Sequence, residues 1–449
     1  MNYTKSNKTE IKFISLAICY TIQICWQNNM QTFYKAKNSL MQKKKPITNK
    51  NEGVIIMNNR HIYMDHAATT PVSPEVLEAM LPYFTDQFGN ASSIYAVGRQ
   101  SKKALEESRE KVAKVIGVTP REIFFTGSGT EADNWAIKGV AYANKGKGKH
   151  IITTAIEHHA VLHACQYLEN NGFNITYLPV DNNGLISPVQ VLDAITPETI
   201  LISIMLANNE IGVIQPIREI AKIAKAKGIV FHTDAVQAVG SIPVDASELD
   251  VDLLSLSAHK FYGPKGAGAL YIKRGTKITS FMHGGMQERG RRASTENIPA
   301  VVGLGKAIEL AALNLDKTGR KLTELRDRTI EEITEKIPFV RLNGDRHKRL
   351  PGNVNFSFEF IEGESLLLML DMKGIAASSG SACTSGSLDP SHVLLAIGLS
   401  HEIAHGSLRI TYGIKNTQED VDYLMKILPR IVERLREMSP LYEKVKRGK

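Results

Sequence analysis

The sequence predicts an α/β protein with a mainly parallel central sheet and a second, smaller α/β domain. Short apolar runs alternate with helical segments between residues 122 and 272, and this alternation is typical of a parallel sheet with helices on both faces. The 449 residues are enough for two domains. With 43% hydrophobic and 22% charged residues, the composition is that of a globular protein.

Capping residues define the first elements. Ser73 is a typical N-cap, and Glu75 lies in the first turn of the helix that follows it. Gly117 ends an amphipathic helix. The expected elements are a short strand that runs into a loop within His61–Pro71, a loop at Gly89–Tyr95 and a helix at Arg99–Ile116.

The middle of the chain supplies the sheet. Its apolar runs are short and are bounded by turn residues, which is typical of buried strands. The expected strands are Glu122–Thr126, His150–Thr154, Ile175–Leu178, Leu201–Met205, Gly228–Asp234, Val251–Leu256 and Ala269–Ile272. The expected helices between them are Thr130–Ala143, Ala160–Asn170 and Ile217–Lys227.

A long helical connection, Pro299–Lys336, leads to the second domain and is expected to break near Gly319. After it come strands at Val354–Phe358 and Leu408–Tyr412 and helices at Glu364–Met372 and Gln418–Met438. We therefore expect a large domain at residues 71–312 and a small domain formed by residues 57–70 and 313–449.

Residues 1–56 differ in composition from the rest of the chain. They hold nine lysines, two glutamates and no arginine, a net charge of +7. Phe13–Trp26 is an apolar run without a typical cleavage site after it. Three interpretations stay open: an artefact of an upstream start codon, a disordered tail, or a targeting or anchoring segment. The first is favoured, because a segment of ordinary globular composition follows Met57. Residues 1–56 are thus expected to be an extraneous or disordered extension.

Charge and cysteine content narrow the class of protein. The chain carries +9, but the 393 residues after position 56 carry only +2, which gives no basic footprint for nucleic acid. Beyond the first segment, no stretch is long and apolar enough to span a membrane. Four cysteines, Cys19, Cys25, Cys165 and Cys383, show no disulfide framework, so a cytoplasmic location fits best.

Lys260 follows the apolar run Val251–Leu256, after Ser257 and His259. It therefore lies just past the end of a core strand, where α/β folds place their ligands. Alone it would be interpreted as a solvated loop lysine. Asp234, however, ends another strand. An aspartate facing a pyridine nitrogen and a lysine in Schiff-base linkage are the two groups that pyridoxal 5'-phosphate (PLP) requires, so the pair predicts a PLP site.

A phosphate anchor is available at Gly127–Glu131, which follows a strand and opens a helix. Glycines there let the backbone approach a ligand, and the helix N-terminus offers free N–H groups to a phosphate. Many strand-to-helix turns look the same, so the signal is weak alone. Beside Lys260 and Asp234, it becomes the natural anchor for the PLP phosphate.

Further polar groups follow separate apolar strands, so we expect them to converge at one rim of the sheet. They are Glu157–His159, Asn208–Glu210 and Gln237, which lies three residues beyond Asp234. The amides of Asn208 and Asn209 suit a ring hydroxyl or a carboxylate. A lone histidine such as His158 is more often structural than functional. No metal site is predicted.

Cys383 lies within Ser378–Ser387, a run of small residues without helical or strand period, which predicts a mobile loop. Cys383 is expected to be accessible, and an incidental loop cysteine stays the alternative. Cys165 lies in a predicted helix and is expected to pack in the core. Arg409 lies in an apolar strand, so its charge needs an anionic partner. The forked geometry of its guanidinium group suits a carboxylate.

Together these motifs are very specific: from Met57 onward, the chain resembles the cysteine desulfurases of the NifS/IscS type, members of the class V aminotransferases. The extended loop around Cys383 is similar to that of the long-loop group of the family. The matching segments are Tyr63–Pro71, Thr126–Ala132, Asn208–Gly212, Asp234–Gln237, Ser257–Lys260, His283–Gly290 with Thr295–Asn297, and Ser378–Ser385.

The resemblance implies the fold type I, aspartate-aminotransferase-like architecture of PLP-dependent transferases, in a homodimer. Lys260 would hold PLP and move the α-proton, Asp234 would pair with the ring nitrogen, and His158 would stack on the ring as a further catalytic residue. The implied phosphate ligands are Gly129, Thr130, Ser257, His259 and, from the other subunit, Thr295.

On the substrate side, Asn209 and Gln237 would lie near the ring hydroxyl and the substrate, and Arg409 would bind the substrate carboxylate. Cys383 would be the nucleophile that takes the sulfur. One departure is visible: Ala91 and Tyr95 stand where the family usually shows proline and histidine. That departure concerns local loop contacts and leaves the chemistry intact.

The implied activity is the conversion of L-cysteine to L-alanine with a persulfide on Cys383. The sulfur would pass to an acceptor or iron–sulfur scaffold protein, with tRNA thiolation as an open second role. The alternatives are a selenocysteine lyase or another class V enzyme, and a non-catalytic scaffold of the same fold. The intact set of Lys260, Asp234 and Cys383 argues against the scaffold.

A chain that starts at Met57 is expected to be as soluble, stable and active as the full chain, because the compositional break and the +7 charge lie before it. Thermal melting and PLP occupancy of the two forms test this expectation. A large drop in either quantity on truncation would show that residues 1–56 contribute to the folded protein.

Overall fold

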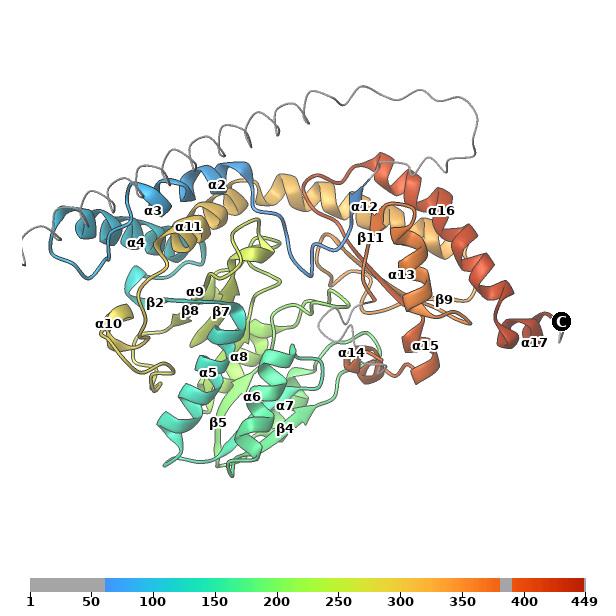
Figure 1. Ribbon diagram of the computed structural model, residues 1–449. Coiled ribbons are helices and arrows are strands. Elements are labelled where there is room, and N and C mark those ends of the chain that lie inside the picture. Colours follow the sequence, from blue (N-terminus) through green and yellow to red (C-terminus); the bar gives the residue numbers. More distant parts are fainter. Residues whose placement is uncertain (1–60, 380–389, 448–449) are drawn as a thin grey trace, which may run out of the picture. The chain divides into compact units, whose positions relative to one another are not determined.

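A computed structural model describes residues 61–379 and 390–447 (Figure 1). All of them belong to the unit that runs from Asn58 to Lys449. The predicted extension at residues 1–56 and the predicted nucleophile Cys383 lie outside the described residues.

A seven-stranded sheet confirms the predicted mainly parallel α/β fold. Its strand order is β2-β8-β7-β6-β5-β3-β4, and within it only β8 runs antiparallel to its neighbours. The strands are β2 (Ile123–Thr126), β3 (His150–Thr154), β4 (Asn174–Leu178), β5 (Thr199–Ser203), β6 (Val230–Asp234), β7 (Leu253–Ser257) and β8 (Gly268–Ile272). Consequently β2, β3, β5, β6 and β7 all end at the same edge of the sheet.

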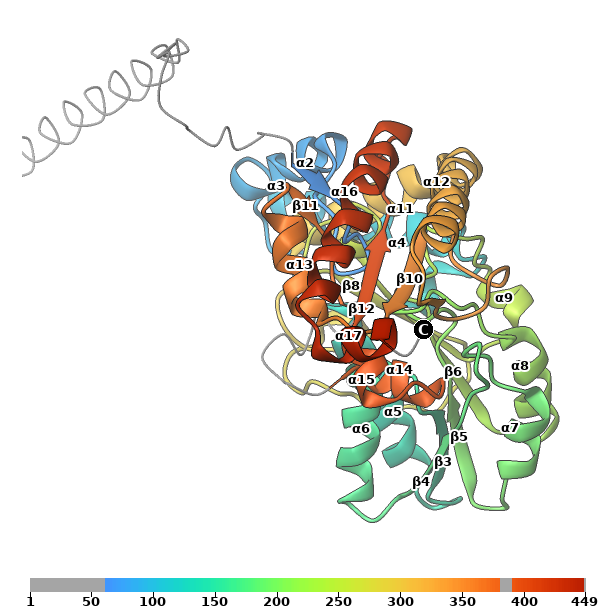
Figure 2. The ribbon, with the colours of Figure 1, turned by 90° about the vertical axis from the view of Figure 1, so that its right-hand side faces the viewer.

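Helices cover both faces of this sheet, and the two-residue period of the strands decides which side chain meets which helix. Phe124, Ile151, Leu201 and Leu253 pack with α5 and α6, whereas the residue after each of them packs on the opposite face with α4, α8 and α11. Figure 2 shows α5 and α6 on one side of the strands and α7 and α8 on the other. The bounds are α2 (Pro74–Met80), α3 (Pro82–Thr85), α4 (Ala96–Val115), α5 (Gly129–Asn144), α6 (His159–Glu169), α7 (Pro188–Ala194), α8 (Ile217–Ala226), α9 (Ala246–Leu249) and α11 (Ile298–Leu313).

A second core forms around a three-stranded antiparallel sheet with the order β12-β10-β9. Ile62 and Met64 from the start of the described chain pack into this core, as the predicted small domain requires. The boundaries of that domain stay a prediction. The elements are β1 (Ile62–Tyr63), β9 (Val340–Leu342), β10 (Asn353–Phe358), β11 (Ile375–Ala376), β12 (Ser407–Thr411), α12 (Leu315–Lys336), α13 (Gly363–Asp371), α14 (His392–Ala396), α15 (His401–His405), α16 (Gln418–Glu437) and α17 (Pro440–Arg447).

The predicted helix break near Gly319 is wrong, because the chain bends at Asn314 instead. The Asn314 side chain donates to the carbonyl of Leu310 at 2.9 Å and so caps α11, and α12 leaves at 71°. Gly319 lies inside α12, where an added Cβ would meet nothing within 4 Å. Among the described residues no single helix is long and apolar enough to cross a membrane, and α11 with α12 passes that test only as a bent pair.

A buried ion pair fixes the segment after β8. Arg109 of α4 forms two hydrogen bonds of 2.8 Å with the carboxylate of Glu288 in α10 (Gln287–Gly290), and both side chains are buried. The same carboxylate accepts the backbone N–H of Phe125 in β2 at 2.9 Å. Glu288 has a φ of 44°, in the left-handed region that an ordinary residue adopts only under constraint. The Arg109–Glu288 ion pair therefore fixes the segment that leads to Thr295 against α4 and β2.

Replacing Glu288 by glutamine is expected to lower the free energy of unfolding by about 3–5 kcal/mol, because it leaves Arg109 without its buried counter-ion. Glu106→Gln is the matched control, since Glu106 also contacts Arg109, at 3.2 Å, but its side chain is 47% exposed. The control is expected to cost no more than about 1 kcal/mol. Urea unfolding measures both variants, and equal losses would contradict the role given to the buried pair.

Candidate functional site

The predicted polar residues lie where five strands end at one edge of the large sheet. Because β2, β3, β5, β6 and β7 run in the same direction, the segments after them meet there, as in other open α/β sheets. Gly129 follows β2, His158 follows β3, Asn209 follows β5, Asp234 ends β6 and Lys260 follows β7. The sequence prediction that these groups converge is consistent with this topology.

Lys260 is held by a loop that sequence reasoning did not connect with it. Its Nζ donates to the carbonyl of Ala67 and, at 2.9 Å, to that of Ala68. Gln237 donates from Nε2 to the same Ala67 carbonyl at 3.0 Å, which places these two predicted site residues together. The loop runs between β1 and α2, and the small residues in it let the backbone approach Lys260.

Asp234 is a buried carboxylate with one strong local partner. Its Oδ1 accepts the backbone N–H of Val236 at 2.8 Å. Burial raises the pKa of Asp234 to about 6, and the positive charge of Lys260 acts in the opposite direction. Asp234 is therefore mostly ionised at neutral pH and available to a proton on a ring nitrogen.

The start of α5, with the end of β7 beside it, forms the predicted phosphate cradle. Gly129 is the first residue of this 16-residue helix, and a Cβ there would meet Val236 at 2.7 Å and Ser257 at 3.4 Å. Glycine therefore allows α5 to begin in close contact with Val236 and with Ser257 at the end of β7. Thr130 follows as an exposed residue of the first turn, where backbone N–H groups have no intrahelical acceptor.

A salt bridge supports the turn that enters this cradle. Arg292 binds the carboxylate of Glu131 through two hydrogen bonds of 2.7 and 3.0 Å. Glu131 in turn accepts the backbone N–H of Gly127 at 2.7 Å. Thr295 lies three residues beyond Arg292, is exposed, and makes no hydrogen bond with another predicted site residue in the described ranges. The described chain therefore does not bring Thr295 into its own cradle.

The two histidines of the site are neutral. His158 caps α6, and its Nδ1 accepts the N–H of Ala160 at 3.1 Å, so the ring proton resides on Nε2. Burial, followed by the charge of Lys260, lowers the pKa of His158 to about 4. The same causes lower the pKa of His259 to about 4, and its Nδ1 lies 3.1 Å from the hydroxyl of Thr69.

Arg409 is buried on β12, and its anionic partner within the chain is Asp65. Nη2 lies 2.8 Å from Asp65 Oδ1, and Nη1 donates to the backbone carbonyl of Asn209 at 3.0 Å. The side-chain Oδ1 of Asn209 is buried and has no hydrogen-bond partner among the described residues. Arg409 and Asn209, both predicted near the substrate, therefore adjoin each other. No pattern in the sequence indicated the ion pair between Arg409 and Asp65.

Both ends of the segment that carries Cys383 are anchored beside the site. Ser378 pairs with Arg409 through two backbone hydrogen bonds of 2.6 and 3.2 Å. At the other end of the segment, Nε2 of His392 lies 3.0 Å from the carbonyl oxygen of Glu157. Glu157 directly precedes the predicted site residue His158. Cys383 itself lies outside the described residues.

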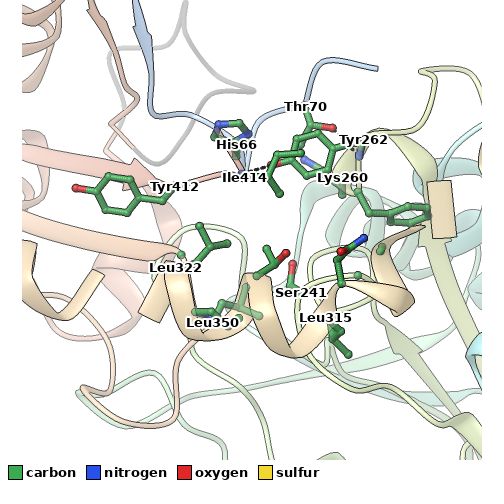
Figure 3. A pocket seen from close by; sticks show the side chains of 18 of the residues that line it. His66, Thr70, Ser241, Lys260, Tyr262, Leu315, Leu322, Leu350, Tyr412 and Ile414 are labelled. Atoms are coloured by element: carbon green, nitrogen blue, oxygen red, sulfur yellow. Dashed lines mark hydrogen bonds between the residues drawn. The ribbon is translucent and has the colours of Figure 1, made fainter. Parts of the chain in front are cut away.

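A cavity of about 490 Å³ adjoins Lys260 but is separate from the cradle. Figure 3 shows Lys260 and Tyr262 at one wall and Leu315 and Leu322 of α12 at another. Of the predicted site residues in the described ranges, Lys260 and Gln237 line it. The cavity therefore lies next to the amine of Lys260 without including the groups that form the cradle.

Comparison with known proteins identifies the family. The profile of the Aminotransferase class-V family matches residues 62–424. A curated relative, "Cysteine desulfurase IscS" of Clostridium botulinum, is 60% identical over 393 residues, which cover 87% of this chain and 99% of the relative.

Two solved structures are also similar. One is titled "NIFS-LIKE PROTEIN", with a TM-score of 0.79 and 39% identity over 84% of this chain and 100% of its own. The other, "SspA in complex with cysteine", has a TM-score of 0.69 and 38% identity over 78% of this chain and 98% of its own. The chain therefore belongs to the class V aminotransferases and, within them, to the cysteine desulfurases of the NifS/IscS type.

Proposed function

We propose that this chain is a PLP-dependent cysteine desulfurase that converts L-cysteine to L-alanine. The observation that carries the proposal is the meeting of Lys260, the buried Asp234 and the N-terminus of α5 at Gly129 at one sheet edge. Family membership supports it, since class V aminotransferases and cysteine desulfurases are PLP-dependent. The related structure titled with bound cysteine supports L-cysteine as the substrate.

The residues present fit the cofactor. The N-terminus of α5 at Gly129 suits a phosphate, because backbone N–H groups of the first turn have no intrahelical acceptor, and Ser257 lies beside it as a further proposed ligand. Thr130 and His259 complete the proposed phosphate ligands. Asp234 would hold the proton of the ring nitrogen, and bound PLP would supply an electron sink next to the α-carbon of the amino acid.

The chain's own groups have distinct proposed tasks around the substrate. The amine of Lys260 holds the cofactor and moves the α-proton, and the Ala67 and Ala68 carbonyls orient it when it is released. His158 offers a neutral ring for stacking. Asn209 and Gln237 lie at the side of the ring hydroxyl and the substrate. Arg409 would bind the substrate carboxylate next to Asn209.

The sulfur step needs a thiolate, for which we propose Cys383. Its sulfur attacks the sulfur of cysteine, so that an S–S bond forms while the C–S bond of the substrate breaks. The electron pair of that bond stays on the substrate carbon, which takes up a proton and leaves as alanine. The enzyme retains a persulfide. Cys165 cannot serve, because it is buried and burial raises its pKa to about 12.

Several finer features also remain proposals. The enzyme would work as a homodimer in which Thr295 of one copy reaches the phosphate of the other, which agrees with its exposure in the described chain. The persulfide would supply iron–sulfur cluster assembly, and a cytoplasmic location fits that role. Residues 71–312 would form the large domain, with residues 57–70 and 313–449 forming the small one. The relatives' names favour cysteine desulfurase over selenocysteine lyase or another class V activity.

Lys260→Ala is expected to abolish alanine formation and the visible absorbance of the lysine-bound cofactor, because an amine is needed both to link PLP and to move the α-proton. The fold is expected to persist, as judged by circular dichroism. Lys265→Ala is the control, since Lys265 is exposed and only five residues away. Near wild-type turnover in Lys260→Ala would show that the lysine is assigned wrongly.

Cys383→Ala is expected to bind PLP and L-cysteine, seen as a change in absorbance, but to form no alanine and no persulfide. Product analysis and mass spectrometry of the intact chain measure these outcomes. Cys165→Ala is the matched control and is expected to keep the activity at a modest cost in stability, since Cys165 only packs in the core. Undiminished alanine production by Cys383→Ala would favour the lyase alternative.

A further inference from the structure

A row of buried polar side chains lies beneath Asp234, between the sheet and α5. His232 and Asp234 are two residues apart on β6, so both point to the same face of the sheet. The neighbouring strands place Ser203 opposite His232 and Ser255 opposite Asp234. Asp133 of α5 covers the row, one helical turn after Gly129. All five side chains are buried.

His232 connects the members of this row. Its Nδ1 lies 2.8 Å from the hydroxyl of Ser203, and its Nε2 lies 3.0 Å from that of Ser255. The same Nε2 lies 3.6 Å from Oδ1 of Asp133. Hydrogen bonds therefore join His232 to both neighbouring strands, and Asp133 lies just beyond hydrogen-bond distance of the same ring.

Among the described residues, no cation acts on Asp133 to balance an ionised carboxylate. His232 stays neutral, because burial lowers its pKa to about 3. The other titratable groups that act on Asp133 are the carboxyls of Asp234 and of Glu157, which follows β3, and Lys260 acts on Asp234. Oδ1 of Asp133 has no hydrogen-bond partner in the described chain. Among the groups around Asp133 in the described chain, the hydroxyl of Ser255 favours an anion, but a neutral hydroxyl does not offset the burial of a charge.

We propose that Asp133 carries a proton at neutral pH and is a positioning residue, acting through His232 and Ser255 to leave Asp234 as the charged carboxylate of the site. The proposal rests on the proposed function in one respect: it takes Asp234 as the carboxylate that faces the ring nitrogen of PLP. The protonation of Asp133 is a property of the folded chain itself.

The electrostatics agree with this geometry. Burial and then the charge of Asp234 raise the pKa of Asp133 well above its ordinary value of 3.8, and burial raises that of Glu157 to about 8. Carboxyls close together in a dry site do not all ionise. At neutral pH, Asp234 therefore keeps its charge, while Asp133 keeps an O–H that it can donate into the row.

The first experiment needs neither cofactor nor activity. When a carboxyl ionises only in the unfolded chain, the free energy of unfolding falls as the pH rises above the ordinary pKa of that carboxyl. Asp133→Asn removes this loss, so its melting temperature is expected to exceed that of the wild type by a margin that grows from pH 4 to pH 8. The infrared spectrum of the wild type minus that of the variant, both without PLP, is expected to show the carbonyl stretch of a protonated carboxyl at pH 8.

Asp250→Asn is the matched control, with the opposite expected sign. Lys225 and Lys273 bind Asp250 and lower its pKa in the folded chain. The ionised Asp250 therefore stabilises the fold when the pH is above its ordinary pKa. This stabilisation is lost as the pH falls through the lowered pKa of the folded chain. The control is expected to melt below the wild type at pH 7 and to approach it in acid. A loss in Asp133→Asn that grows with pH, or the absence of the infrared band, would overturn the proposal.

The second experiment separates positioning from mere packing. The measured quantity is the pH midpoint of the absorbance of bound PLP, together with kcat and KM for L-cysteine. Asp133→Asn keeps a donor and is expected to stay close to the wild type. Asp133→Leu has similar volume but no donor, so its midpoint is expected to shift and its kcat to fall with little change in KM. Equal midpoints in the two variants would refute action through His232. If Lys260 and Cys383 failed their own tests, the melting and infrared results on Asp133 would still stand.

Discussion

The common direction of β2, β3, β5, β6 and β7 is the constraint on which the site depends. Each strand rises about 3.3 Å per residue, so reversing a five-residue strand would move its final polar group by about 16 Å to the opposite edge. Parallel order instead collects the groups after five strands at one edge, where a lysine, a carboxylate and a helix N-terminus can act on one small molecule. The antiparallel β8 preserves this arrangement, because its first residue, Gly268, lies against the backbone of Ser128 at the same edge.

The loop between β1 and α2 joins the two sheets through the site. The N–H of Ala67 donates to the hydroxyl of Thr411 on β12 at 2.9 Å, and its carbonyl accepts from Lys260 and Gln237. Two residues earlier, Asp65 binds Arg409. A shift of β12 relative to the large sheet would therefore be felt at the amine of Lys260. The proposed carboxylate ligand and the proposed base are thus mechanically connected through the loop residues from Asp65 to Ala68.

Local signals and long-range contacts explain how much the sequence could reveal. The bounds of β3 were predicted to the residue, whereas β5 was placed two residues late, because the apolar run continues past the strand into the buried Met205 and Leu206. Lys260 and Asp234 could be found because a polar residue directly after an apolar strand is a local pattern. The pairing of Arg409 with Asp65 joins residues 344 positions apart, and no periodicity or capping rule reports such a contact. Very short elements such as β11 also leave no period to detect.

The electrostatics of the site follow from the same burial that forms the core. Taking a carboxyl out of water favours its neutral form, and Asp133 and Glu157 follow that tendency. Burial also raises the pKa of Asp234, to about 6, but a backbone N–H and the charge of Lys260 oppose this rise and favour its anion. The histidines lose their charge to burial and to Lys260, so they do not compete with the lysine for Asp234. In the proposed arrangement, the buried neighbours of Asp234 stay neutral, so that its carboxylate is the charge that would face a ring nitrogen.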